Sequence, residues 1–560
     1  MSHDLVVRGG LVVDGSGAPP VRADVAIGDG TVVEIGAVDE RGRQELDADG
    51  CVVTPGFVDP HTHLDAQLCW DPAATPTCLH GVTTVVLGIC GFGIAPCPPG
   101  GGDYLLKSLE VVEEIPFASS SLGVPFTWES WPEFLDYLGR QSLGVNVAGM
   151  VPHSALRYAV MGDRAREGAA DDDERAALAA ELRRSLDAGA LGFATSRGPN
   201  HRDAAGDPVP SRHADDAELE ALVAECRGRP WQINVETKFT NDATALTAEV
   251  ERYAAWTAAA GARLTWTPLF ADPGNDVWRD VLTHNRALNE RVEVAPQVIA
   301  QPVTATLRFD RASFARAVAG WETVMTEFLG LSHDDQLART QDNEFRAALR
   351  AAPEDCTRMF APCYSEWILS ASPAHPEVLG QSLAALGAAR GVAPTDALCD
   401  LLLGDDLGTE LQLPVINRDR DASAALVTDD TTMLGLGDAG AHVTSVTNFT
   451  YPTDLLARLV RDEQRLTIED AVARLTTRPA RFFGIPGRGA LRVGAAADVN
   501  VIDLDALAVG RLRSSPDLPG GAHRLYRDAA GYVAVIVNGR ISVRDGVLTG
   551  DANGHTVRAI

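Results

Sequence analysis

Two histidines separated by one residue stand directly after an apolar run near the start of the chain. The run begins at Cys51 and leads into His61 and His63 within the segment PGFVDPHTHLD. If the run is a strand, side chains two residues apart point to the same side, so both imidazoles can converge on one point. Two neutral imidazoles in this arrangement suit a divalent, zinc-like ion. Taken alone, the pair is equally compatible with a loop that carries two solvated histidines.

Two further side chains could complete such a site. Cys90 follows the apolar run TTVVLG, so its thiolate would stand at the end of a second buried strand. A bound metal would lower the pKa of this thiol, although a buried, inert thiol fits the same pattern. Asp438 ends a third run, TTMLGLGD. A carboxylate there could bind the metal and move a proton, or it could simply cap a helix.

The secondary structure that the sequence predicts around these residues differs between the ends of the chain and its middle. The first 50 residues and the far C-terminal part combine β-branched runs with Gly/Asp turns, including a hairpin turn at Asn538-Gly539. Between them, short apolar runs alternate with helical segments. In DDDERAALAAELRRSLDAGALGFATS, a helix should end near Gly189 and pass into a buried strand. Such alternation predicts a parallel sheet, open or closed, inserted into one small β domain built from both termini.

The segment from about 271 to 370 fits regular alternation poorly. In a barrel, a long insertion after a strand falls on the face where chemistry takes place. A surface elaboration without a catalytic role is equally compatible with the sequence.

The composition narrows the class of protein. The chain has 560 residues, 45% hydrophobic and 22% charged, as in an ordinary globular protein with more than one domain. The formal net charge of −29 disfavours nucleic acid and anionic lipid as partners. No apolar run reaches the roughly 18 residues of a membrane span. The start, MSHDLVVRGG, lacks the features of a signal peptide, so the nine cysteines are expected to be reduced thiols in the cytoplasm. The expected partner is a small-molecule substrate, and a homo-oligomer is possible.

Several stretches together resemble the amidohydrolase superfamily and, within it, the D-aminoacylase branch, the N-acyl-D-amino-acid deacylases. They are TPGFVDPHTHLD, GVTTVVLGICGFGIAPC, NVAGMVPHSALRYAVMG, DAGALGFATSRGPNHRDAAGDPVPS and GLGDAGAHV, in this order over nearly the whole chain. The resemblance implies an α/β fold, a metal-dependent (β/α)8 TIM barrel over residues 57–484. It also implies a small β-sandwich domain built from residues 1–56 and 485–560.

The resemblance assigns roles to the residues of the suspected centre. His61 and His63 match the metal ligands of strand one. Cys90 matches the cysteine that this branch uses as a ligand where many relatives have a carboxylated lysine. Asp438 matches the aspartate of strand eight, the general base and acid.

Other residues match positions around the substrate. Ser196 and Arg197, in ATSRGPNHR, stand where the branch places groups beside the substrate. His153, at the end of the run GVNVAGM, is a candidate for binding substrate or supporting the centre, with a purely structural histidine as the alternative. His442, four residues after Asp438, is a further candidate for substrate binding.

The chain departs from the family pattern at two strands. In well-studied deacylases, strands five and six each end in a metal-binding histidine. The corresponding stretches here, WQINVETKF and ARLTWTPLF, contain no histidine, and His284 in VLTHN is expected in a helix. We therefore predict one firmly bound zinc or similar divalent ion rather than two. Glu236 could replace an imidazole as a ligand.

Lysine is scarce, which draws attention to Lys238 in the same stretch. Of the 48 lysine and arginine residues, only Lys107 and Lys238 are lysine. Lys238 could be carbamylated and bind metal, or neutralise a substrate carboxylate. A buried ion pair with Glu236 is the structural alternative.

The resemblance implies hydrolysis of the amide bond of an N-acyl-D-amino acid. Asp438 would take a proton from a metal-activated water and then protonate the leaving nitrogen, while Arg197 or Lys238 neutralises the substrate carboxylate. One alternative is hydrolysis of a cyclic amide, as in hydantoinase or dihydroorotase relatives. Another is a catalytically silent binding protein on the same fold. The two missing histidines favour this last reading, and the retention of the four centre residues disfavours it.

Overall fold

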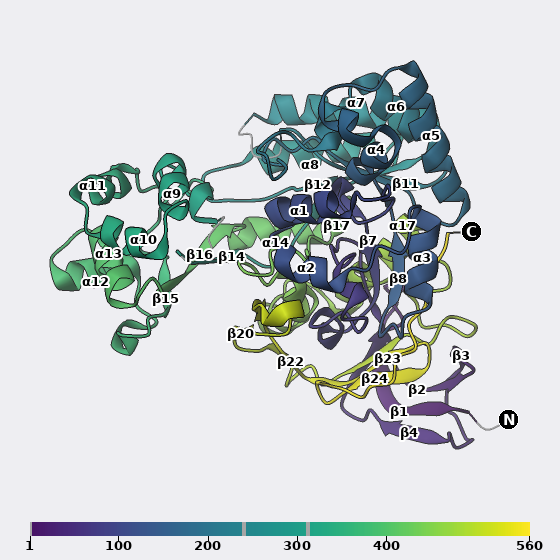
Figure 1. Cartoon of the computed structure of the whole chain (residues 1–560). Helices are drawn as coiled ribbons and strands as arrows, with labels where there is room; N and C mark the ends of the chain where they lie inside the picture. The colour runs from purple at the N-terminus through teal and green to yellow at the C-terminus, as the bar shows by residue number, and fades with distance from the viewer. Residues whose placement is uncertain (1–2, 238–241, 310–313, 560) are drawn as a thin grey trace.

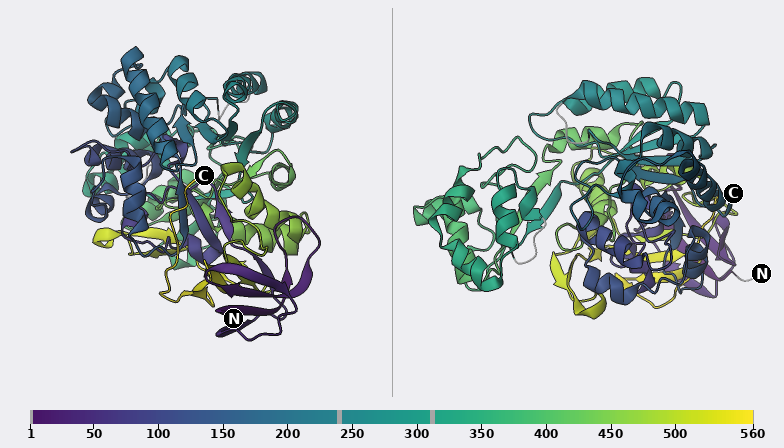
Figure 2. Two further views of the ribbon diagram at one scale, coloured as in Figure 1. Left: turned by 90° about the vertical axis from the view of Figure 1, so that its right-hand side faces the viewer. Right: turned by 45° about the horizontal axis from the view of Figure 1, so that its top comes forward.

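The computed structural model describes residues 3–237, 242–309 and 314–559. It consists of an α/β body, a sheet built from the N-terminal and C-terminal segments of the chain, and a lobe of mainly helical segments that projects from the body (Figure 1). The same lobe projects from the body in the tilted view of Figure 2. The largest hydrophobic core is continuous through the body, and a smaller one fills the terminal sheet.

Parallel strands form the centre of the body. β6 (Phe57–Asp59) pairs with β7 (Val82–Leu87), which pairs with β8 (Asn146–Gly149). A second parallel sheet contains, in this order, β9 (Val151–Pro152), β10 (Phe193–Ser196), β11 (Pro230–Asn234), β12 (Arg263–Thr267), β13 (Val294–Val298) and β17 (Met433–Leu434). Only Met150 separates β8 from β9. A single parallel bridge, Thr62 to Ala439, joins the chain beyond β6 to the chain beyond β17.

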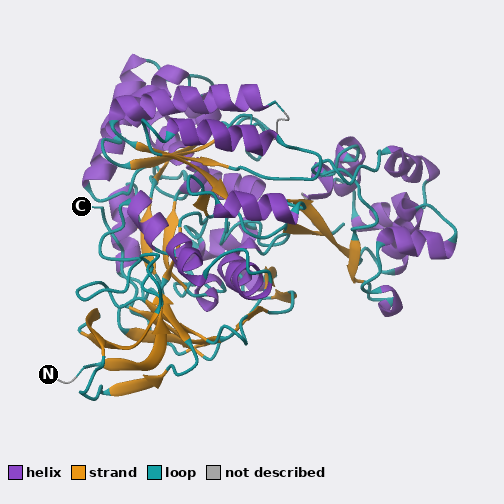
Figure 3. Ribbon diagram, turned by 180° about the vertical axis from the view of Figure 1, so that it is seen from behind, coloured by secondary structure: helices purple, strands orange, loops and turns teal. Residues whose placement is uncertain are grey.

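Helices alternate with these strands along the chain and lie outside them, as the purple ribbons of Figure 3 show. In the first half they are α1 (Gly102–Glu113), α2 (Phe117–Gly123), α3 (Trp131–Gly139), α4 (His153–Met161), α5 (Asp172–Asp187), α6 (Asp216–Glu225), α7 (Ala243–Ala260) and α8 (Val277–Leu288). After the lobe follow α14 (Arg420–Thr428), α15 (Tyr451–Asp454), a π-helical turn region (Leu455–Asp462), α16 (Ile468–Leu475) and α17 (Thr477–Phe483).

The predicted passage from helix to strand near Gly189 is confirmed. α5 begins with a capping box, in which Asp171 and Glu174 satisfy each other's backbone N–H groups. It ends at Asp187, and Gly189 then adopts a φ of +105°. A side chain at this position would also meet Arg558, so glycine is required there. β10 follows directly.

Strands from both ends of the chain share one nine-stranded sheet. Its order is β25 (Val547–Leu548), β24 (Arg540–Arg544), β23 (Tyr532–Val537), β18 (Val499–Ile502), β5 (Val52–Pro55), β1 (Leu5–Val12), β2 (Val21–Gly28) and β3 (Thr31–Gly36), with β4 (Gln44–Asp47) beside β1. The predicted hairpin turn at Asn538-Gly539 connects β23 to β24, and both residues have positive φ. Two short pairs, β19 (Ala508–Val509) with β22 (Ala529–Ala530) and β20 (Arg513–Ser515) with β21 (Arg524–Tyr526), lie in the same C-terminal part.

The irregular segment begins later than its sequence suggests. α8 and β13 continue the regular alternation as far as residue 298, and the added lobe runs from β14 to β16. A three-stranded sheet, β14 (Val303–Leu307), β16 (Glu410–Ile416) and β15 (Ile368–Ala371), connects the lobe to the body. Its helices are α9 (Glu322–Leu329), α10 (His333–Thr340), α11 (Asn343–Ala351), α12 (Leu383–Arg390) and α13 (Pro394–Gly404).

One expectation about the cysteines is corrected. Cys356 and Cys363 form a disulfide, although the sequence was expected to hold only reduced thiols. The two residues bracket a tight turn in the lobe, which the hydrogen bond from the Asp355 N–H to the Pro362 carbonyl closes at 2.9 Å. Sequence spacing alone could not show that their Cα atoms are 4.9 Å apart.

In the described part of the chain, no helix has both the length and the apolar character needed to cross a membrane.

Candidate metal centre and active site

Four of the predicted centre residues lie together at the ends of three strands of the body. The donor atoms of His61, His63 and Cys90 all lie within 4.8 Å of one another, and all three residues are buried. The Cys90 Sγ is 3.4 Å from the His61 Nε2. An Asp438 carboxylate oxygen lies 3.2 Å from the His61 Nε2 and 4.0 Å from the His63 Nε2. Two imidazoles, one thiol and one carboxylate form a donor set that fits a zinc-type ion.

The orientation of the two imidazoles also fits metal binding. The His61 Nδ1 is 2.5 Å from the Gln297 Oε1, and the His63 Nδ1 is 3.6 Å from a carboxylate oxygen of Glu113. The His61 Nδ1 is therefore hydrogen-bonded to an acceptor and the His63 Nδ1 lies near a carboxylate without a hydrogen bond to it, while each Nε2 faces the cluster. Burial is the main cause that lowers the pKa of both histidines, so both are neutral at neutral pH. A neutral ring with its proton on Nδ1 presents an Nε2 lone pair for a metal.

Cys90 is held by its backbone as well as by its position. It has a φ of +56°, and its N–H donates to the Gln232 Oε1 at 2.8 Å. The Asn234 Nδ2 is 3.7 Å from its sulfur. Two residues earlier, Gly88 has a φ of +72° and approaches the Met150 carbonyl so closely that a Cβ would lie 2.1 Å from its oxygen. The glycine-rich sequence after β7 is thus needed to turn Cys90 towards the histidines.

Asp438 stands in a loop and not at the start of a helix, which removes the helix-cap alternative. It follows β17 with a φ of +45°. The His63 N–H donates to the Ala439 carbonyl at 2.7 Å, and Gly440 packs directly on the His63 carbonyl. These contacts fix the Asp438 loop against the segment that carries the histidine pair.

A cavity of about 300 Å³ opens over this centre. Its polar lining includes the four centre residues with Glu113, Glu114, Asn200, His201, Asn234, Thr267, His442, Ser445 and Asn448. Apolar side chains make up much of the rest: Val111, Val112, Phe270, Ile299, Val303, Phe360, Val415, Ile416, Leu436 and Val446. Residues of the 303–416 segment therefore form part of the wall. The disulfide-closed turn contributes Phe360, which has a φ of +60°.

His442 lies on this wall between two carboxylates. Its Nε2 is 3.8 Å from Glu113 and its Nδ1 is 3.7 Å from Glu114, whose carboxylate also accepts from the Ser445 hydroxyl. Burial lowers the pKa of His442, but the two carboxylates outweigh it and raise the pKa to about 9. The side chain is therefore an imidazolium at neutral pH and the cationic part of a mainly acidic cluster.

Two predicted substrate residues point elsewhere. Arg197 is absent from the cavity lining; its guanidinium pairs with Asp216 at 2.8 Å, because the Asp216 carboxylate at the start of α6 lies beside it. His153 is fully buried between Thr195 and Glu218, each 2.8 Å from one ring nitrogen, so it is a structural histidine. In both cases the side chain binds a carboxylate of α6, Asp216 or Glu218. The local sequence around Arg197 and His153 does not reveal this contact.

Ser196 contacts His201, a cavity residue that was not predicted from the sequence. Its hydroxyl is 2.6 Å from the Nδ1 of His201, and the N–H of Gly198 donates to the same hydroxyl. His201, and not Ser196, lines the cavity. The SRGPNHR segment thus places an imidazole at the site through a serine at the end of β10.

The structure does not bring Glu236 to the cluster, and the expected ligand role is corrected accordingly. β11 ends at Asn234, and the exposed Glu236 lies in the turn that follows, where its N–H donates to Glu249. Lys238 lies outside the described residues. His284 is on α8, as expected, and pairs with Glu251 at 3.2 Å.

Asn234 and Thr267 occupy the ends of β11 and β12, where the family pattern predicts histidines. They pair with each other across the two strands, and both line the cavity. The Thr267 hydroxyl accepts a hydrogen bond from the Gln232 Nε2 at 3.0 Å. These residues, with Glu113, Glu114 and Gln297, were not predicted. The only sequence signal for Asn234 and Thr267 was their place at the end of an apolar run, and Glu113, Glu114 and Gln297 had none.

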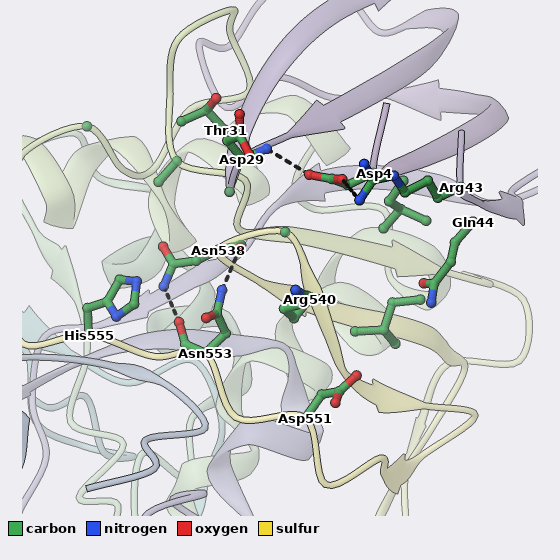
Figure 4. Close-up of a pocket in the computed structure, with 16 residues that line it drawn as sticks. Asp4, Asp29, Thr31, Arg43, Gln44, Asn538, Arg540, Asp551, Asn553 and His555 are labelled. Carbon is green, nitrogen blue, oxygen red and sulfur yellow. Dashed lines mark hydrogen bonds and ion pairs between the residues drawn. The ribbon is translucent and has the colours of Figure 1, made fainter. Parts of the chain in front are cut away.

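A larger hollow of about 580 Å³ lies at the terminal sheet, away from this centre. The close-up in Figure 4 shows that its polar side chains come from the two ends of the chain. Asn538 and Asn553 bind each other's backbone carbonyls at 2.6 and 2.7 Å, and the Asp29 N–H donates to Asp4. Because these groups are largely exposed or already paired, the smaller cavity over the histidine pair is the candidate active site.

Comparison with known proteins identifies the family of this chain. A family model described as the amidohydrolase family matches residues 44–543. The N-acyl-D-glutamate deacylase of Alcaligenes xylosoxydans xylosoxydans is 30% identical over 96% of this chain and 93% of that protein. A crystal structure of N-acyl-D-glutamate deacylase from Bordetella bronchiseptica, in complex with zinc and a phosphonate inhibitor, is 26% identical with a TM-score of 0.66 over both whole chains. A D-aminoacylase structure, 22% identical with a TM-score of 0.65, covers 99% of this chain and all of its own and shows the same fold.

Proposed function

The chain belongs to the amidohydrolase family, and on this premise we propose that it is a metal-dependent hydrolase whose substrate is an N-acyl-D-amino acid. The observation that carries the proposal is the convergence of His61, His63, Cys90 and Asp438 at the base of one cavity. The names of the deacylase relatives support the amide bond and the D-amino acid. The fold, α/β of the TIM-barrel type with a β-rich domain, is the one shared with those enzymes.

We further propose that a single zinc-type ion is held by some combination of His61, His63, Cys90 and Asp438, which leaves a ligand position for water. The chemistry of this donor set supports zinc, which is also the metal in the related deacylase complex. Asn234 and Thr267 support one ion rather than two, because an amide and a hydroxyl are weaker ligands for zinc than the imidazoles expected at these strand ends.

When bound, the ion would lower the pKa of water and polarise the amide carbonyl. Asp438 takes a proton from the water as the water oxygen adds to the carbonyl carbon. Asp438 then delivers this proton to the leaving nitrogen as the C–N bond breaks, which yields a carboxylate and an amine. The position of Asp438, 20% exposed at the cavity floor and 3.2 Å from His61, supports this dual role because its carboxylate reaches both the centre and the open cavity.

For the substrate, we propose that His442 neutralises the carboxylate of the amino acid. The raised pKa of its imidazole supports a charged side chain at neutral pH. Lys238 remains a second proposed contact, from the sequence alone. The apolar residues of the wall would receive the acyl group or the amino-acid side chain.

We also propose the domain limits. Residues 57–484 would form a closed (β/α)8 barrel, with the Thr62 to Ala439 bridge at its closure. Residues 1–56 and 485–560 would form one β-sandwich domain. The sharing of a sheet by β5 and β18 supports this division.

Two measurements on purified protein test the proposed function. Metal analysis after chelator-free purification should find about one zinc per chain if the proposed centre is correct. A panel of N-acyl-D-amino acids, their L-enantiomers and cyclic amides should show hydrolysis of the D-compounds. Turnover of cyclic amides alone would assign a hydantoinase-like activity instead. Absence of both metal and turnover would favour a silent binding protein.

A further inference from the structure

The end of β11 places an amide side chain beside the proposed centre. Asn234 pairs with Ser196 of β10 on one side and with Thr267 of β12 on the other. Its backbone carbonyl accepts from the Arg197 N–H at 2.9 Å. The residue is only 6% exposed and lines the candidate cavity. Strand pairing on both sides therefore fixes the position from which its side chain reaches the centre.

The two ends of this amide have different surroundings. The Nδ2 group is a donor and lies 3.7 Å from the Cys90 sulfur. The Oδ1 is buried and has no hydrogen-bond partner among the residues that the structure describes. A buried acceptor without a donor costs folding free energy, and in a cavity wall a ligand can supply the missing hydrogen bond.

We propose that the Asn234 Oδ1 accepts a hydrogen bond from the N–H of the scissile amide, an inference that rests on the proposed function. The reaction brings one obligatory N–H donor to this centre, the one on the nitrogen that leaves. An acceptor that is held rigidly beside the centre would orient this nitrogen and select secondary amides over esters, which lack the proton. Asn234 is thus a substrate-contacting residue at a position where the family pattern predicts a metal ligand.

The Thr267 side chain supports this assignment. Its hydroxyl oxygen accepts from the Gln232 Nε2, and its own proton is available to donate. Thr267 and Asn234 are directly paired residues of β12 and β11. The pair therefore presents a polar edge that matches an amide group, which carries both an acceptor and a donor.

A pair of inhibitors that differ in one atom tests the inference. A phosphonamidate analogue of the substrate carries an N–H where the matching phosphonate ester carries oxygen. Zinc-loaded wild-type protein should bind the N–H compound about 5- to 150-fold more tightly, the range for leaving a buried acceptor unpaired. In Asn234→Ala and in the better-filled Asn234→Val, this preference should fall to less than threefold with zinc content unchanged. Thermal unfolding would establish that each variant is folded.

Asn285→Ala provides the matched control. Asn285 is also a buried asparagine, 1% exposed on α8, and it is absent from the cavity lining. Its removal should lower the thermal midpoint and leave the N–H preference as in the wild type. Retention of the preference in both Asn234 variants would overturn the inference, and so would loss of zinc from them, which would make Asn234 a support of the metal.

The same experiment separates this inference from the proposed function. Wild-type protein that hydrolyses N-acyl-D-amino acids but binds the two inhibitors equally would refute the role of Asn234 alone. Wild-type protein that neither hydrolyses these amides nor binds either inhibitor would refute the proposed function, and the inference with it. Hydrolysis together with a preference that depends on Asn234 supports both.

Discussion

Gln297→Leu should weaken zinc binding without removing any zinc ligand. In the absence of metal, the neutral ring of His61 can carry its proton on Nε2, because an Asp438 oxygen lies 3.2 Å away and can accept it. Metal binding through Nε2 moves the proton to Nδ1, where the fully buried Gln297 Oε1 accepts it at 2.5 Å. Leucine has no acceptor, so the metal-bound form of the variant would contain a buried, unpaired N–H group.

The size of the effect follows from this unpaired group. An unsatisfied buried donor costs about 1–3 kcal/mol. At about 1.4 kcal/mol per tenfold change, the zinc dissociation constant should rise roughly 5- to 150-fold. This range agrees with the roughly 10- to 100-fold losses that follow when the partner of a metal-binding histidine is removed. Competition with a chromogenic chelator at fixed pH would measure the constant directly.

Gln336→Leu is the matched control for this experiment. Gln336 is also a buried glutamine, and its Nε2 donates to the Phe328 carbonyl within the helical lobe. Its replacement should lower stability and leave zinc affinity unchanged. If Gln297→Leu binds zinc within threefold of the wild type, Gln297 does not set the proton position of His61, and the orientation argument for the two histidines fails.

Three further predictions concern the reaction, the cysteines and the pH dependence of stability. Asp438→Asn should lower kcat by about 10²- to 10⁴-fold, because an amide cannot accept the water's proton; assay and metal analysis should find much of the zinc retained, and near-normal kcat would remove Asp438 from the mechanism. Protein purified and denatured without reductant should expose seven of its nine thiols, because Cys356 and Cys363 are bonded; nine reactive thiols would contradict this. Burial lowers the pKa of His80 to about 4. The unfolded chain therefore binds the proton more readily, and the contribution of His80 to stability should fall by up to about 3 kcal/mol from pH 6.5 to pH 4. His80→Gln should show a correspondingly flatter pH profile of the thermal midpoint, and an unchanged profile would refute the assignment.

The order of elements was predictable from the sequence because periodicity is a local signal. The alternation of helices and strands, the passage near Gly189 and the turn at Asn538-Gly539 all depend on neighbours within a few residues. The limits of the lobe were not predictable in this way. α8 and β13 follow the regular alternation, but the motifs that surround them, such as DPGND, resemble those of an irregular segment. Only the pairing of β13 with β12 and β17 assigns them to the body.

The histidine pair of the centre was also predictable from a local pattern, but the residues that contact the two histidines were not. His61 and His63 lie beyond the last residue of β6, yet the bridge between Thr62 and Ala439 keeps the backbone extended there. The inference that both rings face the same way therefore holds outside the strand. In contrast, Glu113 and Gln297 reach the histidines from segments about 50 and 236 positions away. No local pattern in a single sequence carries such contacts.

The end of β11 shows how far the alternation of side chains along a strand predicts which residues face the centre. Side chains at alternate positions of a strand share one face, so Gln232, Asn234 and Glu236 would all face the centre if the strand continued. The first two do, since Gln232 binds the Cys90 backbone and Asn234 lies beside its sulfur. Glu236 does not, because β11 ends at Asn234 and the chain turns there. The Glu236 N–H donates a hydrogen bond to Glu249 on α7, which holds this turn. The correct face was thus readable from the sequence, but the last residue on it was decided by a carboxylate from the following helix, which leaves an amide at the place where an acidic ligand was expected.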